Sequence, residues 1–140
     1  MPLVSLLLNV AWLVFGGVWM AAAWLVAAVL MAITIIGLPW ARSALTIAGY
    51  TLLPFGNTVV DRDPQGVGPL GFIGNLVWFA LAGWWLALAH LVTAAGLAVT
   101  IVGLPFAWAH LKLALLALWP LGKEVVPAGR ATMPRYVGAR

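Results

Sequence analysis

The chain has no cysteine and very few charged residues. Its 140 residues include seven Lys/Arg and three Asp/Glu, so that 7% are charged while 65% are hydrophobic. A soluble domain usually carries about 25% charged residues, so these few charges cannot cover a surface that faces water. The absence of cysteine excludes disulfides, thiolate chemistry and Cys-based metal sites. The composition therefore predicts a membrane-embedded protein.

The positive charge is too sparse for a nucleic-acid-binding surface. The net charge is +4, but the basic residues form no cluster of the kind that nucleic acid requires. No Lys or Arg precedes the apolar run at the N-terminus, which argues against a cleaved signal peptide. We therefore expect the lipid bilayer as a partner, and no nucleic acid.

Two long runs, residues 3–36 and 69–102, contain no charged residue. As one straight helix, either run would reach roughly 50 Å, well beyond a hydrocarbon core of about 30 Å. Each run must therefore tilt strongly, project from the bilayer or break. The pair Gly16-Gly17 is the weak point of the first run, and Trp12, Trp19 and Trp24 around it favour a break there, because Trp prefers the membrane interface. The alternative, that these tryptophans pack against neighbouring helices, stays open.

Both runs end in a similar phrase, Thr-Ile-x-Gly-Leu-Pro. Glycine suits the end of a helix and proline suits the first turn of the next one, so shorter return segments are expected over 39–55 and 105–120. Two interpretations of these breaks stay open. Non-helical backbone at membrane depth would line a cavity, as in discontinuous transporter helices, whereas a Gly-Pro turn at the membrane surface would have no such role.

The second half of the chain repeats the first. Residues 9–60 align with 75–126 at a constant offset and without a gap, and about 23 of the 52 aligned positions are identical. The identities include Asn, Trp, Gly and Pro, which apolar composition alone does not explain. The sequence therefore predicts two tandem repeats.

At these residues the chain resembles the YccF family of small bacterial inner-membrane proteins. The phrases that carry the resemblance are Asn75-Leu-Val-Trp78, Gly83-Trp84-Trp85, Thr100-Ile-Val-Gly-Leu-Pro105 and Trp119-Pro-Leu-Gly-Lys-Glu-Val-Val126. The resemblance covers nearly the whole chain. It implies a multi-pass protein of the bacterial inner membrane and supplies no catalytic residue.

The expected fold is all-α and polytopic, with one long or broken apolar helix and one shorter return helix in each repeat. The first repeat covers 1–60, with its core at 9–60, and the second covers 75–126. A polar linker occupies 61–74 and a basic tail 127–140. The Lys/Arg bias of this tail predicts a cytoplasmic C-terminus. Parallel and inverted repeats both stay open, and the similarity of the repeats favours parallel ones.

A few polar residues inside the apolar runs are candidates for function. The candidate pore or polar membrane contacts are Asn9, Asn75, Thr34, Thr100, His110 and Lys112, with helix breaks at Gly37, Pro39, Gly103 and Pro105. Asparagine in lipid needs a hydrogen-bonding partner, which is either a neighbouring helix or a pore. Ionisable residues at membrane depth usually face a cavity or a partner, although a lysine near an interface can also extend its ammonium group to water.

No arrangement of residues predicts catalysis. His90 and His110 lack both the i,i+4 spacing and the third ligand of a metal site, and Asp61 with Asp63 lacks the further oxygens of a calcium loop. His90 aligns with Trp24, so it is expected to be an amphipathic side chain at the interface. We expect no enzyme activity, no cofactor and no metal.

The best functional hypothesis is an oligomeric ion channel or pore. One protomer has too few membrane segments to enclose a path, so ions would pass between the protomers of a homo-oligomer. A non-conducting membrane scaffold or accessory protein is the first alternative. A small transporter with its site at the helix breaks is the second.

Overall fold

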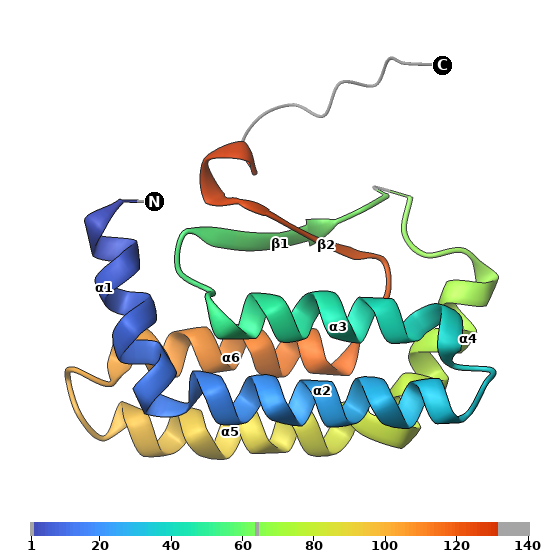
Figure 1. Cartoon of the computed structure of the whole chain (residues 1–140), viewed down its shortest axis with the longest axis horizontal. Helices are drawn as coiled ribbons and strands as arrows, with labels where there is room; N and C mark the ends of the chain where they lie inside the picture. The colour runs from blue at the N-terminus through green and yellow to red at the C-terminus, as the bar shows by residue number, and fades with distance from the viewer. Residues whose placement is uncertain (1, 64, 132–140) are drawn as a thin grey trace.

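The computed structural model describes residues 2–63 and 65–131, which form two similar sets of helices (Figure 1). In each set a long apolar run folds into two helices joined by a turn of π-helix. A shorter helix then runs back along the second of them, and a strand follows. The chain is mostly helical, as its composition and repeats predict.

The first long run bends in its middle, as its glycine pair predicts. Helix α1 (Leu3–Trp12) and helix α2 (Val18–Ile33) are joined by the π-helical turn Leu13–Gly17. Within this turn Phe15 leaves the helical region and Gly16 has a φ of 129°, a conformation that L side chains rarely adopt. The chain therefore turns from α1 into an α2 that runs across the molecule (Figure 1).

The second long run is built in the same way. Helix α4 (Pro69–Trp78), the π-helical turn Phe79–Gly83 and helix α5 (Trp84–Ala98) follow one another. Ala82 stands where the first repeat has Gly16, and no residue of this turn has a positive φ. The second bend is thus made with helical backbone angles, whereas the first includes a true break. Helix α4 also includes residues 69–74, which lie in the expected linker.

The return segments are the helices α3 (Leu38–Leu52) and α6 (Leu104–Leu118). Pro39 and Pro105 occupy the first turn of these helices, where the missing N–H of proline costs nothing. Helix α3 packs along α2, and α6 packs along α5. Each repeat is therefore a helical hairpin with an upright helix, α1 or α4, at one end of the molecule (Figure 1).

The expectation of an all-α fold is wrong in one respect, because the repeats share a small sheet. Strand β1 (Asn57–Asp61) pairs with strand β2 (Lys123–Pro127) in antiparallel fashion, and a 3-10 turn, Ala128–Arg130, follows. Each strand comes after a glycine of positive φ, Gly56 or Gly122, and contains a Val-Val pair that favours the extended state. In the sequence these valines lie at the ends of the two repeats, and no strand is expected there.

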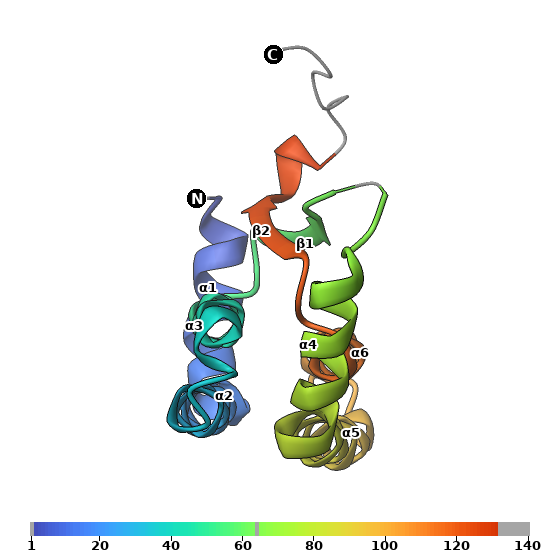
Figure 2. The same ribbon diagram turned by 90° about the vertical axis from the view of Figure 1, so that its right-hand side faces the viewer.

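The register of the sheet shows how the repeats are related. Val59 lies opposite Val125, and these two residues are equivalent in the repeats. An antiparallel pair centred on equivalent residues is what a two-fold axis produces. Figure 2 shows the strands exchanged between the repeats, with β1 on the side of α6 and β2 on the side of α3. The chain is therefore a pseudo-dimer with an axis through its sheet.

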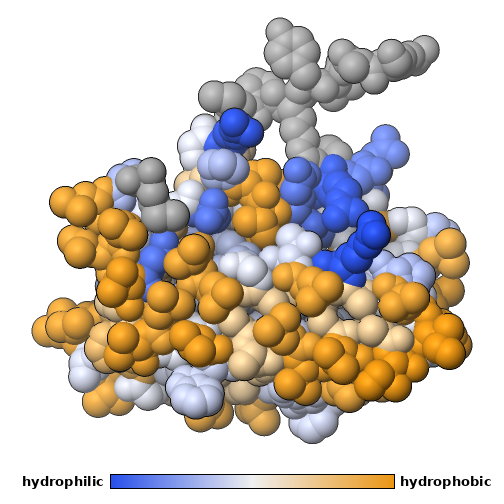
Figure 3. Space-filling view, viewed as in Figure 1, coloured by the Kyte–Doolittle hydropathy of each residue, from blue (hydrophilic) through white to orange (hydrophobic). Residues whose placement is uncertain are grey.

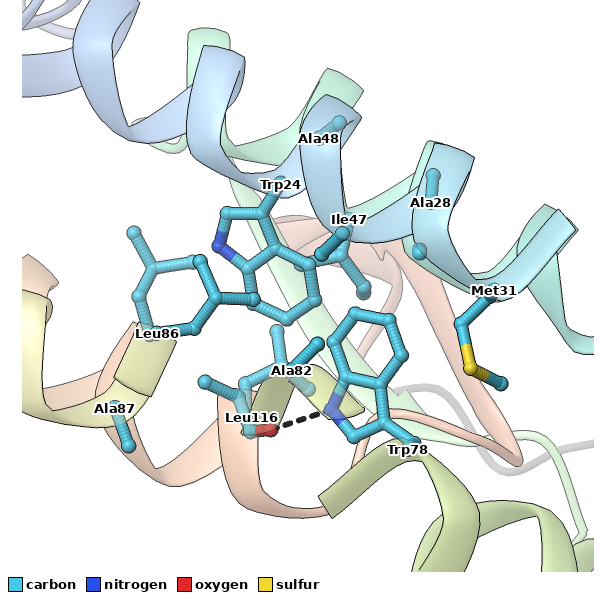
Figure 4. Packing of buried hydrophobic residues seen from close by; sticks show 14 of the residues in the cluster. Trp24, Ala28, Met31, Ile47, Ala48, Trp78, Ala82, Leu86, Ala87 and Leu116 are labelled. Carbon is cyan, nitrogen blue, oxygen red and sulfur yellow. Dashed lines mark hydrogen bonds between the residues drawn. The ribbon is translucent and has the colours of Figure 1, made fainter. Parts of the chain in front are cut away.

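The core on this axis consists of tryptophan and small residues. Trp12, Trp24 and Trp78 are fully buried. Trp24 stacks on Trp78 with ring centroids 5.4 Å apart, and alanines of the neighbouring helices let the helices approach these rings (Figure 4). The centre of the molecule is thus filled with aromatic side chains.

The surface is divided into a polar and an apolar side. Polar residues gather around the sheet, while apolar side chains cover the helices below it (Figure 3). Large hydrophobic residues of the long helices are exposed, among them Leu3, Val14 and Trp19 at 70%, 77% and 76%. A soluble monomer does not expose such a continuous apolar surface. By length and composition, the runs Leu3–Ile33 and Pro69–Ala98 are able to cross a membrane.

Candidate functional site

In each repeat, an asparagine of the first helix hydrogen-bonds the backbone just after the return helix. Asn9 Nδ2 donates to the Phe55 carbonyl at 2.9 Å, and its Oδ1 accepts from the Phe55 N–H at 3.0 Å. Asn75 makes the equivalent pair of bonds to Leu121, at 3.5 and 3.0 Å. Both asparagines are buried. Their amides thus form hydrogen bonds with backbone groups of the same chain.

A second clamp repeats one helical turn further on. Trp12 Nε1 donates to the Thr51 carbonyl and Trp78 Nε1 to the Ala117 carbonyl, both at 2.7 Å; the bond of Trp78 is the dashed line in Figure 4. Buried tryptophan usually has such a partner. A signal for these bonds is present in the repeat, because Trp12 and Trp78 are equivalent residues, but their bonding partners cannot be recognised from it.

The Thr-Ile-x-Gly-Leu-Pro phrases form tight turns that satisfy their own polar groups. Thr34 Oγ1 donates to the Met31 carbonyl at 2.6 Å and accepts from the Gly37 N–H at 3.0 Å. A Cβ on Gly37 would collide with the Met31 carbonyl oxygen, so only glycine fits. Thr100 and Gly103 repeat this pattern. The turns lie at opposite ends of the helical layer (Figure 1) and are not brought together.

The structure does bring two histidines together at the centre of the core. His90 and His110 are both fully buried, and their Nδ1 atoms are 2.9 Å apart. Trp24 Nε1 donates to His90 Nε2 at 3.1 Å. Trp24 and His90 are equivalent residues in the repeats, so this bond crosses the pseudo-two-fold axis. The expectation that His90 lies at the interface is wrong.

The hydrogen bonds define the proton positions of a neutral histidine pair. The indole N–H of Trp24 can only donate, so His90 Nε2 accepts and His90 carries its proton on Nδ1. His90 then donates to His110 Nδ1, which leaves the proton of His110 on Nε2. This atom is buried close to the backbone of Phe15, although no partner among the described residues meets full hydrogen-bond geometry. It faces the bend of the first long run, where a Cβ on Gly16 would lie 3.3 Å from it.

The two histidines occupy the space that Trp24 and Ala44 fill in the first repeat. His90 aligns with Trp24, and His110 aligns with Ala44. His110 packs on Trp12 with ring centroids 4.4 Å apart. It does so from the position in the second repeat that is equivalent to Ala44 in the first. One large and one small side chain are thus exchanged for two of intermediate size, which keeps the packing volume nearly constant.

Lys112 lies apart from the histidine pair, on the exposed side of α6. Its ammonium group is 5.6 Å from the centroid of the Trp108 ring, and it forms no ion pair within the described part of the chain. Across residues 2–63 and 65–131, no group of three or more His, Asp or Glu is arranged to hold a metal ion. The absence of enzyme activity stays a prediction.

Each repeat has a bent apolar run and a return helix, and the two repeats share a sheet on a pseudo-two-fold axis. These features define a duplicated, mainly helical membrane protein. The sequence model of the YccF family, described as an inner membrane component domain, matches residues 7–57 and 73–123. The chain is 35% identical to the inner membrane protein YccF of Escherichia coli (strain K12) and to that of Shigella flexneri, over 95% of each chain. The chain therefore belongs to the YccF family of inner-membrane proteins. No solved structure matches it.

Proposed function

We propose that this inner-membrane protein forms a homo-oligomer and that ions pass between its protomers along a path lined by α3. The observation that carries the proposal is a difference between equivalent helices. Helix α6 is an apolar helix along its length, although it is shorter than the two candidate membrane spans, whereas α3 is the least apolar of the α-helices. A helix that faces lipid must be apolar, so α3 is the better candidate for contact with water or with a neighbouring protomer.

The polar residues of α3 form a stripe on its exposed side. Arg42 and Thr46 are exposed, one helical turn apart, and Ser43 beside them is half-buried. The equivalents of Arg42 and Thr46 in α6 are Trp108 and Lys112. Around a symmetry axis, the Arg42 side chains would form a cationic ring, and such rings favour anions. We therefore expect the path to prefer chloride over potassium.

The positions of the sheet and of the basic residues near it support a topology with the sheet in the cytoplasm. The first residues of α1, both strands and the linker lie on one side of the helical layer (Figure 1), and Arg62, Lys123 and Arg130 belong to this side. With the pseudo-two-fold axis along the membrane normal, both repeats enter the bilayer from the cytoplasm and return to it. The repeats are then parallel, and the C-terminus is cytoplasmic, in agreement with the positive-inside rule.

A non-conducting scaffold is the second candidate. The filled aromatic core favours it, because Trp12, Trp24 and Trp78 occupy the centre of the protomer and no path through that centre is needed for a protein that only binds neighbours. A transporter with its site at the helix breaks has less support. The two turns lie far apart in the fold, and their side chains, such as Ile36 and Ile101, are exposed and apolar.

Reconstitution of the purified protein into liposomes distinguishes these candidates. We expect an oligomer of more than two subunits and a chloride flux that Arg42→Trp, which gives α3 the residue of α6, reduces at least tenfold. The matched change Lys112→Thr, which gives α6 the residue of α3, should leave both the oligomer and the flux intact.

A stable oligomer without flux at any voltage would favour the scaffold over the channel. A monomer in lipid nanodiscs would exclude the assembly itself. Equal flux in the wild type and in Arg42→Trp would remove α3 from the path.

A further inference from the structure

A groove of about 330 Å³ lies between the sheet and α6. Three of its lining residues are charged, Lys112 from α6 and the pair of Asp61 and Lys123 from the two strands. The other walls are largely apolar and include Leu116 and Trp119. The groove therefore lies at the boundary between the polar and the apolar side of the molecule.

The charged residues that line the groove have a net charge of +1. Lys123 Nζ is 2.6 Å from Asp61 Oδ1, so these two charges compensate each other, while Lys112 has no carboxylate partner in the described part of the chain. Glu124, the next residue of β2, is not among the residues that line the groove. A single phosphodiester is the anion whose charge matches these lining residues.

A second, purely apolar groove of about 290 Å³ continues from the first along the helices. It lies between α5 and α6, where Leu91, Leu111 and Leu118 contribute to its walls. Leu115 lines both grooves and is 72% exposed. A groove with a net positive charge that continues into an apolar groove is the pattern that an anionic amphiphile requires, and in an inner-membrane protein this surface is exposed to such molecules.

The geometry points to one bound anionic phospholipid on the second repeat. Its phosphodiester binds in the groove that Lys112 and Lys123 line, and one acyl chain follows Leu115 into the groove between α5 and α6. The pattern resembles a basic pocket between membrane helices, which commonly binds lipid headgroups. This site is independent of the proposed ion path, because it lies on α6 rather than on α3.

The first repeat lacks this site at the equivalent positions. Thr46 stands in place of Lys112, Gly49 in place of Leu115 and Asn57 in place of Lys123. The pseudo-two-fold axis therefore places one cationic groove on α6 and none on α3. We expect a stoichiometry of one retained anionic lipid per protomer.

Native mass spectrometry of the purified protein, supplied with lipids of identical acyl chains, measures this binding. Phosphatidylglycerol should be retained one per protomer and in clear preference to phosphatidylcholine. Lys112→Thr should reduce that retention about fivefold, since a basic residue near a membrane surface contributes about that factor to binding of anionic lipid. Because Lys112 is exposed, the variant should remain folded, which circular dichroism verifies. Asp61→Asn removes the compensating charge and should increase retention.

Matched changes separate a built site from a general attraction of lysine for lipid. Arg42→Thr removes a cation from α3 and should leave retention unchanged. Leu115→Trp should fill the apolar groove and reduce retention while the two lysines remain.

Equal retention of both lipids, or equal retention by the wild type and Lys112→Thr, would overturn the proposal. Binding of glycerol 3-phosphate as tightly as phosphatidylglycerol would also overturn it, because the site would then recognise a free phosphate ester rather than a lipid. Lipid retention is measured on the protein chain released into the mass spectrometer. Its outcome therefore does not depend on whether the protein conducts ions.

Discussion

The two repeats share the hydrogen bonds that their asparagine and tryptophan side chains make to the backbone. They differ in the residues that lie on the pseudo-two-fold axis and on the exposed sides of α3 and α6. Asn9 and Asn75 bind equivalent backbone groups, and so do Trp12 and Trp78. At the axis, by contrast, Trp24 faces His90, and the exposed sides of α3 and α6 have different chemistry. A feature present in both repeats is explained by the fold they share, whereas a feature present in one repeat needs a reason of its own.

The largest expected effect is the loss of either tryptophan clamp. Trp12→Ala and Trp78→Ala should each lower the free energy of unfolding by about 3–5 kcal/mol, because each removes a fully buried side chain and leaves a backbone carbonyl without its donor. The two values should agree within about 1 kcal/mol if the clamps are equivalent. Unfolding by sodium dodecyl sulfate from mild detergent micelles measures both.

The control for this comparison is Trp19→Ala. Trp19 is 76% exposed, so its removal should change the free energy of unfolding by less than about 0.5 kcal/mol. A clear difference between Trp12→Ala and Trp78→Ala would show that the repeats are not mechanically equivalent, despite their matching hydrogen bonds.

An intermediate effect is expected when the second repeat is given the core of the first. His90→Trp alone overpacks the axis and should destabilise by about 1–3 kcal/mol. His110→Ala alone leaves a space and an unpaired His90 N–H, at a similar cost. The double variant restores a large and a small residue, so its destabilisation should be smaller than the sum by about 1–3 kcal/mol.

This cycle also separates packing from function. If the double variant is stable but inactive in the flux assay, the histidine pair has a role beyond filling space. If it is stable and fully active, the pair is a packing solution only. If the destabilisation of the double variant equals the sum of the two single changes, the large and small residues of the two repeats do not compensate each other. That result would contradict what the alignment of the repeats indicates.

The smallest expected effect concerns the ion pair at the edge of the sheet. Asp61 is 64% exposed in its side chain, and its equivalent in the second repeat is Pro127, which has no charge. Asp61→Asn should change the free energy of unfolding by less than about 0.5 kcal/mol, because exposed ion pairs contribute little. The same variant should nevertheless alter lipid retention, so stability and binding are expected to differ at this residue.

Much of the helical plan could be predicted from the sequence. The repeats follow from identities at a constant offset, the first bend from its glycine pair, and the return helices from their Gly-Leu-Pro phrases. These signals are local, and each has a direct backbone cause. The sheet was missed because a Val-Val pair is too short to indicate a strand by itself, and because the partner of β1 lies in the other repeat.

The histidine pair was missed for a different reason. His90 and His110 have no helical spacing between them, so inspection of one helix at a time does not join them. A signal was nevertheless present. The repeat fails at both residues together, with Trp24 opposite His90 and Ala44 opposite His110, and such a paired exchange of large and small residues is what contact across a shared core produces.

The exchanged strands also have a consequence for the synthesis of the protein. Strand β1 is complete once the first repeat has left the ribosome, but its partner β2 is made only after almost the entire second repeat. During this interval β1 presents an unpaired edge, a form of backbone that readily pairs with another chain. Two nascent chains on one polysome could therefore join through their first repeats, and the nearness of Asp61 and Arg62 to this edge gives it the charge that discourages such pairing.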